Sequence, residues 1–439
     1  MTVREIALKL LLEYETGGKY VNLSLSSPIL SGLSPKDRAQ LTVLFYTAVE
    51  RKLKYDYYIA AFAKRSIDKI DIQTRNILRL GICQLLDISS IPDFAAVSET
   101  VKLARHKGER AFINGILRAI ARAREDGKLP RPEREKDEAR YLSVEYSFPK
   151  PVVKHFISLF GGDGAEAILS SFNTRRSLDI TVNTLKISRD EYLGLLNKSG
   201  VSAAPSALSS LSVRIDTAIP PRELPGFFDG LFFVQDEACA VSAEVLGTSR
   251  GDAVIDVCSA PGGKSFAAAI LSHGEGRVTS FDIHDSKLSL IESGRDRLGF
   301  SSLSCAVRDA REPDSTLFGL YDRVICDVPC SGLGVLGKKP DLRYKDISDG
   351  DLPALQYEIL EKSFNYLRPG GTLVYSTCTL DPRENEEVAA RFLSEHKDAA
   401  SSDFTVGGRT STHGCMTLLP HVDGTDGFFI AKFVKRENL

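Results

Sequence analysis

Apolar residues at the start of the chain recur at intervals of three and four positions. The segments that show this spacing are LKLLLEY, LTVLFYTAVERKLKYDYYIAAF, IQTRNILRLGICQLL and AVSETVKLA. The spacing is typical of helices with one apolar face, and turn-forming clusters such as SGLSPKD and SSIPDF separate the segments. We therefore predict an all-helical domain over residues 1–125. A charged, proline-containing linker over residues 126–139 follows it, with almost nothing to bury.

A different pattern occupies residues 140–235. SFPKPVVKHFISLF is typical of a helix that prolines begin, and SRDEYLGLLNKSG has the cap residues of a second helix. SLDITVNTL and LSVRIDT have the apolar and β-branched residues of strands. The region is predicted to be a small α+β module.

From about residue 236, short apolar runs end in polar or glycine-rich loops, and helical stretches lie between them. The runs occur in GDAVIDVCSAPGGKSFAAAIL, GRVTSFDI, DRVICDVPC and GGTLVYSTC. Such alternation predicts an α/β domain over residues 236–439, with a Rossmann-like parallel sheet covered by helices on both faces. Binding sites in such sheets lie at the carboxyl ends of the strands.

The composition mainly argues against certain classes of protein and site. Among 439 residues, 43% are hydrophobic and 26% are charged, which is ordinary for a globular protein. No apolar run reaches the roughly 18 residues of a membrane helix, and the acidic start of the chain does not resemble a secretion signal. We expect a cytoplasmic protein with no membrane partner. The eight cysteines are scattered without a CxxC pair, so neither disulfides nor a metal site is predicted.

Positive charge is concentrated in the front part of the chain. Residues 1–150 hold 26 Lys and Arg against 19 Asp and Glu, a balance of +7, whereas the remainder holds 30 against 39, a balance of −9. This asymmetry is typical of a front half that meets a polyanion. An ordinary solvated helical surface would account for it equally well.

The segment CSAPGGK follows a buried run and precedes a helix that we expect to begin at about Lys264. Gly262 and Gly263 let the backbone approach a ligand closely, and the amino terminus of a helix offers N–H groups and partial positive charge. The predicted cofactor loop consists of Cys258, Ser259, Ala260, Pro261, Gly262, Gly263 and Lys264.

Aspartates end the neighbouring strand-like runs, at Asp282, Asp309 and Asp327. An acidic side chain at such a position can bind the hydroxyls of a ribose, so we predict a nucleoside site. The phosphate-binding patterns GxGxxG and GxxxxGK[ST] are both absent. S-adenosylmethionine, which has a ribose and an amino acid but no phosphate, therefore fits better than a dinucleotide. A tight turn with unrelated surface aspartates is the alternative.

Three segments carry a family resemblance: CSAPGGKS, DVPCSGLGVLGKKPDLRYK and YSTCTLDPRENEEV. Together with the closing DGTDGFFIAKFVK, they resemble the Sun/Fmu group of RNA cytosine-5 methyltransferases. The helical front resembles NusB, an RNA-binding fold that members acting on bacterial ribosomal RNA carry. The resemblance implies methyl transfer from S-adenosylmethionine to C5 of a specific cytosine in 16S ribosomal RNA, either naked or in an early precursor. It gives no indication of a metal, and we expect a monomer.

The implied chemistry explains the two cysteines of these motifs. C5 of cytosine is too weak a nucleophile, and a thiolate that adds to C6 activates it. By resemblance, Cys378 is this nucleophile and Cys330 assists release of the product. Asp327 would form hydrogen bonds with the base, and the positive charge of Lys264 would keep Asp327 or the thiolate in place. Because DNA cytosine methyltransferases attack with a Pro-Cys cysteine, the sequence alone also permits the reverse assignment.

Two basic segments are candidates for contacts with RNA phosphates. The first is GKKPDLRYK, with Lys338, Lys339, Arg343 and Lys345. The second is ARHKGERAFINGILRAIARAR, with Arg105, Lys107, Arg110, Arg118, Arg122 and Arg124. Surface charge without a ligand is the alternative for both. Asn183, in VNTL, matches the RNA-binding segment of the family through a short motif only.

Two other functions are compatible with parts of the chain. A non-catalytic RNA-binding factor would use only the NusB-like front, but the paired cysteines and the glycine loop argue against it. A dinucleotide oxidoreductase would use a similar sheet, but the GxGxxG motif of that class is absent from this chain.

Overall fold

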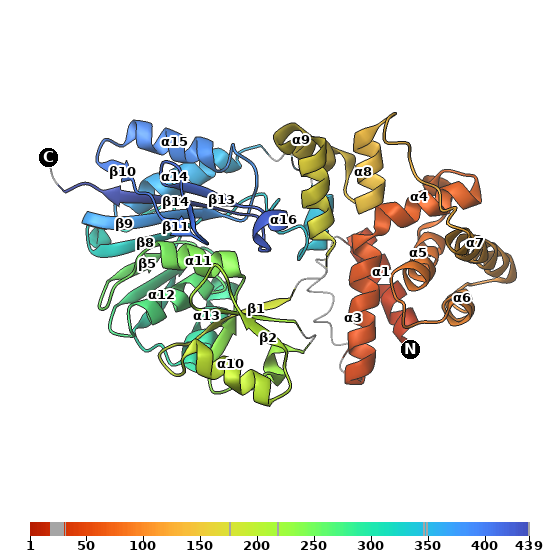
Figure 1. Ribbon diagram of the computed structural model, residues 1–439, viewed down its shortest axis with the longest axis horizontal. Coiled ribbons are helices and arrows are strands. Elements are labelled where there is room, and N and C mark those ends of the chain that lie inside the picture. Colours follow the sequence, from red (N-terminus) through yellow and green to blue (C-terminus); the bar gives the residue numbers. More distant parts are fainter. Residues whose placement is uncertain are drawn as a thin grey trace. The chain divides into compact units, whose positions relative to one another are not determined.

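The structure is a computed structural model that describes residues 1–17, 30, 32–174, 177–216, 219–345, 347 and 350–437. The chain forms two compact units (Figure 1). The first consists of Met1–Asn173 and Leu336–Ile347, and the second of Thr174–Val335 and Ser348–Leu439. Within the described residues, no helix combines the length and apolar character that crossing a membrane requires.

The first unit is helical. Its helices are α1 (Val3–Gly17), α3 (Pro35–Glu50), α4 (Lys52–Ala63), α5 (Ile72–Leu86), α6 (Asp93–Val101), α7 (Lys107–Glu125), α8 (Glu138–Tyr146) and α9 (Lys150–Phe172). Buried leucines, isoleucines and aromatic residues of the first six form one core. The all-helical prediction is confirmed, although one predicted helix is divided at Arg51, whose backbone (φ −97°, ψ 10°) is not helical. Residues 126–137 contain neither helix nor strand.

The second unit begins with a small antiparallel sheet in the order β2-β3-β1-β4. Its strands are β1 (Leu178–Val182), β2 (Ala203–Pro205), β3 (Ser212–Ile215) and β4 (Phe232–Val234). Helix α10 (Arg189–Lys198) begins at a capping box in which Ser188 and Glu191 bond each other's backbone N–H groups. The predicted strands and helix are confirmed, except that Thr217 of LSVRIDT lies outside the described residues.

The large sheet has eight strands, in the order β10-β14-β9-β8-β5-β6-β7 with β13 beside β14. The central strands β5 (Val254–Asp256), β6 (Val278–Asp282), β7 (Leu303–Val307), β8 (Tyr321–Asp327) and β9 (Leu367–Thr377) are parallel. The strands β10 (Ala399–Ser401), β13 (Cys415–Leu418) and β14 (Phe428–Lys435) add an antiparallel edge. The predicted parallel sheet is confirmed for the centre, and the mixed edge was not predicted.

Helices cover both faces of this sheet (Figure 1). On one face lie α11 (Glu237–Val245), α12 (Gly263–Leu271) and α13 (Asp285–Leu298), and on the other α14 (Leu352–Phe364) and α15 (Glu386–Glu395). Strand β5 lies between β6 and β8, so the strand order reverses at β5. Open α/β sheets bind ligands at this reversal, beyond the carboxyl ends of the strands.

Candidate active site

The two predicted cysteines meet at the carboxyl ends of neighbouring strands. Cys330 lies in the loop after β8, Cys378 directly follows β9, and their sulfur atoms are 3.2 Å apart. Both side chains are partly exposed. The structure therefore brings together two thiols that 48 positions separate in the sequence, at a place that a ligand can reach.

Asp327 and Lys264 form an ion pair beside these loops. Lys264 Nζ lies 2.7 Å from Asp327 Oδ2, with side-chain exposures of 8% and 31%. Ser376 donates a hydrogen bond of 2.6 Å to the other carboxylate oxygen. Burial lowers the pKa of Lys264, but the charge of Asp327 and its hydrogen bond outweigh burial and raise the pKa above its usual value. The lysine is thus a fixed cation that orients Asp327.

In the predicted cofactor loop, a glycine is sterically required at position 262. Gly262 has a φ of 109°, and a Cβ there would lie 2.6 Å from the ring of Phe266. A Cβ at Gly263 would lie 3.0 Å from Nε2 of Gln235. Gly262 is the N-cap of α12, so the loop presents backbone at a helix amino terminus, as the sequence predicted.

The predicted aspartates are placed differently from one another. Asp282 is buried and accepts hydrogen bonds from the backbone N–H groups of Ala260 (3.1 Å) and His284 (3.0 Å), so it joins the end of β6 to the cofactor loop. Asp309 lies two residues beyond β7 and pairs with Arg311 at 2.6 Å. Side-chain hydrogen bonds from Arg311 lower the pKa of Asp309.

Two buried polar residues at this site were missed by the sequence analysis. Gln235 is 6% exposed, and its Nε2 has no hydrogen-bond partner although it lies next to Gly263. Asp256, at the end of β5, is 1% exposed, and its Oδ1 is also without a hydrogen-bond partner. An unpaired buried polar atom is costly, so both atoms are candidates for contact with a ligand. No local motif marks either residue.

Several of the remaining cysteines are affected by burial. Burial raises the pKa of Cys239 to about 12, an effect that the charge of Lys264 partly offsets. Burial also raises the pKa of Cys258 well above its usual value. Cys326 is fully buried, as predicted for a core residue, whereas Cys305 is partly exposed. Thiols with raised pKa values are poor nucleophiles at neutral pH.

The predicted RNA contacts require a correction at Arg343. Its side chain is fully buried, donates to the carbonyl oxygens of Leu336 and Phe172, and lies 4.2 Å from the ring centroid of Phe148. It cannot reach an RNA phosphate from this position, because the segment 336–347 packs into the helical unit. Lys338, Lys339 and Lys345 are exposed.

Asn183 is also fully buried. Its Nδ2 donates hydrogen bonds to the carbonyl oxygens of Gly230 and Leu298. These bonds fix the side chain in the interior of the second unit, and the match of VNTL to the family's RNA-binding segment stays a prediction.

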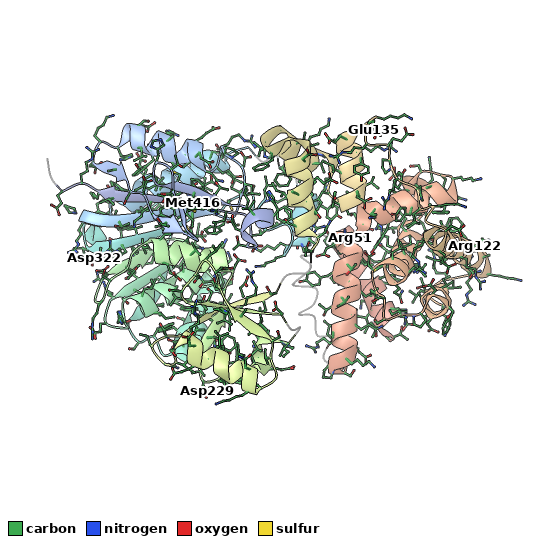
Figure 2. The ribbon with its side chains drawn as sticks, viewed as in Figure 1. Arg51, Arg122, Glu135, Asp229, Asp322 and Met416 are labelled. Atoms are coloured by element: carbon green, nitrogen blue, oxygen red, sulfur yellow. The ribbon has the colours of Figure 1, made fainter. Side chains whose placement is uncertain are left out.

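On α7, exposed basic side chains accompany paired ones. Arg105, just before the helix, pairs with Asp71 and Glu109, and Arg124 pairs with Asp93. Lys107, Arg110, Arg118 and Arg122 are exposed, and Arg122 is labelled in Figure 2. The helix therefore keeps a basic surface, although part of its charge is neutralised.

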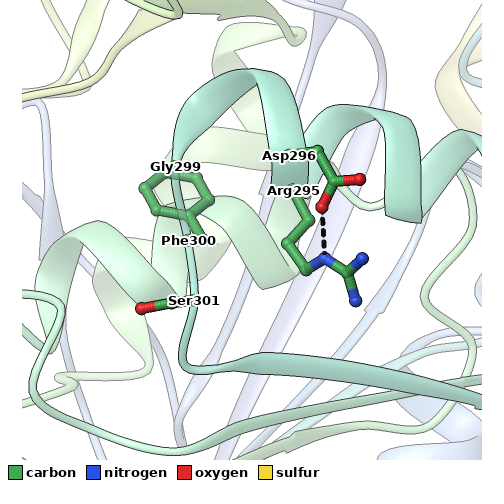
Figure 3. Close-up of a pocket in the computed structure, with 5 residues that line it drawn as sticks. All are labelled: Arg295, Asp296, Gly299, Phe300 and Ser301. Atoms are coloured by element: carbon green, nitrogen blue, oxygen red, sulfur yellow. Dashed lines mark hydrogen bonds and ion pairs between the residues drawn. The ribbon is translucent and has the colours of Figure 1, made fainter.

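A pocket of about 400 Å³ lies elsewhere, at the end of α13 (Figure 3). Arg295, Asp296, Gly299, Phe300 and Ser301 line it. None of the predicted site residues contributes to it, and the Arg295–Asp296 pair that it contains joins chain neighbours. Within the described residues, no group of histidine, cysteine or acidic side chains is arranged to hold a metal ion.

Comparison with known proteins decides the family. Residues 243–434 match the family described as 16S rRNA methyltransferase RsmB/F, residues 1–122 match the NusB family, and residues 148–221 match the ferredoxin-like domain of RsmF/B-like methyltransferases. A Bacillus subtilis (strain 168) protein named "Probable ribosomal RNA small subunit methyltransferase B" is 35% identical, over 99% of both chains. The chain belongs to the RsmB/F family of 16S rRNA methyltransferases. The predicted resemblance and the NusB-like front are confirmed.

Solved structures share the fold of this RsmB/F family member. The crystal structure of PH0851 has a TM-score of 0.78 and 24% identity, and covers 99% of both chains. A methyltransferase homologue from Pyrococcus horikoshii is 26% identical with a TM-score of 0.60, and covers 68% of this chain and 99% of its own. The helical front, the small module and the Rossmann-like catalytic fold were all predicted.

Proposed function

We propose that this methyltransferase transfers a methyl group from S-adenosylmethionine to C5 of a specific cytosine in 16S ribosomal RNA. The observation that carries the proposal is the pair of sulfur atoms, Cys330 and Cys378, 3.2 Å apart at strand ends beside the Lys264–Asp327 ion pair. Methylation of a nitrogen or an oxygen would not need a thiol, whereas C5 of cytosine needs a nucleophile at C6.

In the proposed reaction, the thiolate of Cys378 adds to C6 of the cytosine and C5 gains electron density. After C5 has accepted the methyl group, a base removes the C5 proton and the thiolate leaves, so that the cysteine is regenerated. Cys330, in contact with the leaving sulfur, assists this release. Asp327, oriented by Lys264 and Ser376, hydrogen-bonds the base at N3 and the exocyclic amine and stabilises the adduct.

The residues of the glycine loop fit S-adenosylmethionine, which supplies the methyl group when bound. A carboxylate suits the amino terminus of α12 and the unpaired Nε2 of Gln235. Asp282 and Asp309 suit ribose hydroxyls, and Cys258, Ser259, Ala260 and Pro261 would contribute mainly backbone. Asp327 is also proposed to contact the cofactor.

RNA would approach through a single-stranded or flipped cytosine, because the target atom is inaccessible in a stack. We assign phosphate contacts to the exposed lysines 338, 339 and 345 and to the basic surface of α7. Residues 1–125, 140–235 and 236–439 are proposed as the functional parts, with the first two binding RNA and the third performing the chemistry. The protein would act as a monomer on naked RNA or an early precursor.

Replacing each cysteine separately tests the assignment. With 16S ribosomal RNA and labelled methyl donor, Cys378→Ala should incorporate no label and form no adduct. Cys330→Ala should leave protein covalently attached to RNA, seen as a slowly migrating band on a denaturing gel. Cys305→Ala, a cysteine at a different strand, is the matched control and should behave as the wild type.

Each result has a distinct consequence. An adduct with Cys378→Ala but none with Cys330→Ala would reverse the two roles. Full label incorporation by Cys378→Ala would overturn the covalent mechanism. Label found at a position other than C5 after nuclease digestion and mass spectrometry would overturn the proposed product.

A further inference from the structure

Two buried side chains outside the proposed catalytic group, Gln356 and Glu384, hold the residues that flank Cys330. Nε2 of Gln356, on α14, donates a hydrogen bond of 3.0 Å to the carbonyl oxygen of Pro329. The N–H of Ser331 donates one of 2.9 Å to Oε2 of Glu384. The same Oε2 accepts a bond of 2.8 Å from Gln356. The residues before and after Cys330 are therefore fixed by one connected pair.

The residues that flank Cys378 are held by Glu384 and by its chain neighbour Asn385. The hydroxyl of Thr377 donates to Oδ1 of Asn385 at 2.6 Å, and Nδ2 of Asn385 donates to the carbonyl oxygen of Thr379 at 3.1 Å. The hydroxyl of Thr379 lies 3.4 Å from Oε1 of Glu384. Because Glu384 and Asn385 are adjacent, they link both cysteine loops to the start of α15.

A direct bridge between the loops accompanies this link. The hydroxyls of Ser331 and Thr379 are 2.7 Å apart, and each belongs to the residue that follows a cysteine. Gln356, Glu384 and Asn385 are exposed by only 0%, 4% and 1%. Water is thereby excluded from the network, and each hydrogen bond counts for more than it would on the surface.

We propose that Gln356, Glu384 and Asn385 form a clamp that sets the distance between the two thiols. These are positioning residues and do not touch the reacting base. The inference rests on the proposed function only for its catalytic consequence, because attack by one sulfur and release assisted by the other require a fixed spacing. The geometric part concerns the protein alone.

The spacing can be measured without RNA. Phenylarsine oxide forms two As–S bonds with a pair of neighbouring thiols and releases water, so its affinity reports how well the two sulfurs are held together. Binding of phenylarsine oxide to this thiol pair is the part of the total binding that is lost in Cys330→Ser. Glu384→Ala should weaken this binding at least tenfold. Glu387→Gln, at an exposed glutamate three residues along, is the matched control and should bind as the wild type does.

Catalysis supplies the second measurement. Glu384→Ala should lower kcat at least tenfold while the KM for RNA and the Kd for S-adenosylmethionine change less than twofold, since neither site is altered. A general loss of structure would instead change all three constants together. Glu384→Gln serves as a second variant in case the alanine variant folds poorly. It keeps the side-chain volume but replaces one acceptor with a donor, so it should lower kcat less strongly while KM and Kd again stay nearly unchanged.

The outcomes separate the clamp from the proposed function. Unchanged arsenical binding in both Glu384 variants would overturn the clamp. Weakened arsenical binding with an unchanged kcat would overturn its positioning role. Full label incorporation by Cys378→Ala would overturn the proposed covalent function, whereas the arsenical result would still decide whether the clamp exists.

Discussion

At the scale of single residues, Asp256 contains a buried carboxyl whose ionisation is tied to stability. Burial raises its pKa to about 7, although the hydroxyl of Ser265 and the charge of Lys264 act in the opposite direction. Ser265 donates to Oδ2 at 2.7 Å and accepts in turn from Ser280. The unfolded carboxyl has a pKa of about 4. Between these two values, the folded chain holds a proton that the unfolded chain has lost.

Stability conferred by this proton should therefore decrease as the pH rises from about 4 to about 7. Asp256→Asn resembles the protonated form and cannot ionise. We expect its free energy of unfolding, relative to the wild type, to increase by about 2 kcal/mol between pH 5 and pH 7. Urea unfolding followed by circular dichroism measures this. A difference between the two proteins that does not change with pH would show that Asp256 ionises normally.

Residue chemistry was predictable where a motif carried it. Lys264, Asp327, Cys330 and Cys378 were selected from the sequence, and the structure brings them to one edge of the sheet. Gln235 and Asp256 were not, because what distinguishes them is an unpaired atom in a buried place, and burial is created by distant segments. Arg343 was misassigned since a basic residue in a polar turn normally points to solvent.

At the scale of elements, three loops are joined backbone to backbone next to the cysteines. The N–H of Gly334 donates to the carbonyl oxygen of Cys378 at 2.9 Å, and the N–H of Gly427 donates to the carbonyl oxygen of Gly334 at 2.9 Å. A Cβ on Gly334 would lie 1.9 Å from the carbonyl oxygen of Gly427. Only a glycine lets the loop after β8 approach the loop before β14 so closely.

Gly334→Ala should therefore displace a backbone, lower stability by at least about 2 kcal/mol and reduce methyl transfer, because the carbonyl of Cys378 loses its donor. Thermal unfolding and label incorporation measure the two effects. Gly194→Ala is the control: it lies in α10, a Cβ there meets nothing within 4 Å, and helix propensity predicts a gain of about 0.5–1 kcal/mol. Equal behaviour of the two variants would contradict the close approach.

Most helices and strands were predictable from the local spacing of apolar residues. Where the structure differs from the prediction, contacts between distant segments are the cause. The parallel strands β5 to β9 were predicted because each is an apolar run followed by a polar loop. The antiparallel pairing of β14 with β9 was not, since strand order depends on contacts between segments far apart in the chain. The break at Arg51 was missed because apolar spacing continues through it. The clamp residues Glu384 and Asn385 were within a quoted motif, but only the fold assigns them a task.

At the scale of the whole molecule, the segment Leu336–Ile347 belongs to the first, helical unit, although the chain on both sides of it belongs to the second unit. Arg343 anchors it through hydrogen bonds to the carbonyl oxygens of Phe172 and Glu50. The same segment exposes its three lysines. The buried cation on this segment thus holds the structure together, whereas the exposed lysines are the proposed contacts with RNA.

The distinction predicts how salt affects RNA binding. Replacing Lys338, Lys339 and Lys345 together with glutamine should remove up to three phosphate contacts. We expect the slope of log K against log salt concentration to become shallower by about 2, since each contact contributes about 0.7–0.9. Filter binding to 16S ribosomal RNA at several salt concentrations measures this slope. The loss of affinity should not depend on the sequence around the target, because phosphate contacts carry no sequence information.

A matched control separates position from net charge. Lys287, Arg391 and Lys397 are exposed on the second unit, within residues 236–439, and their joint replacement with glutamine removes the same charge. That variant should keep the wild-type slope, because screened charges more than about 10 Å from the RNA contribute little. If both triple variants shifted the slope equally, RNA binding would respond to the overall charge of the protein, and the exposed lysines of the anchored segment would have no special contact with RNA.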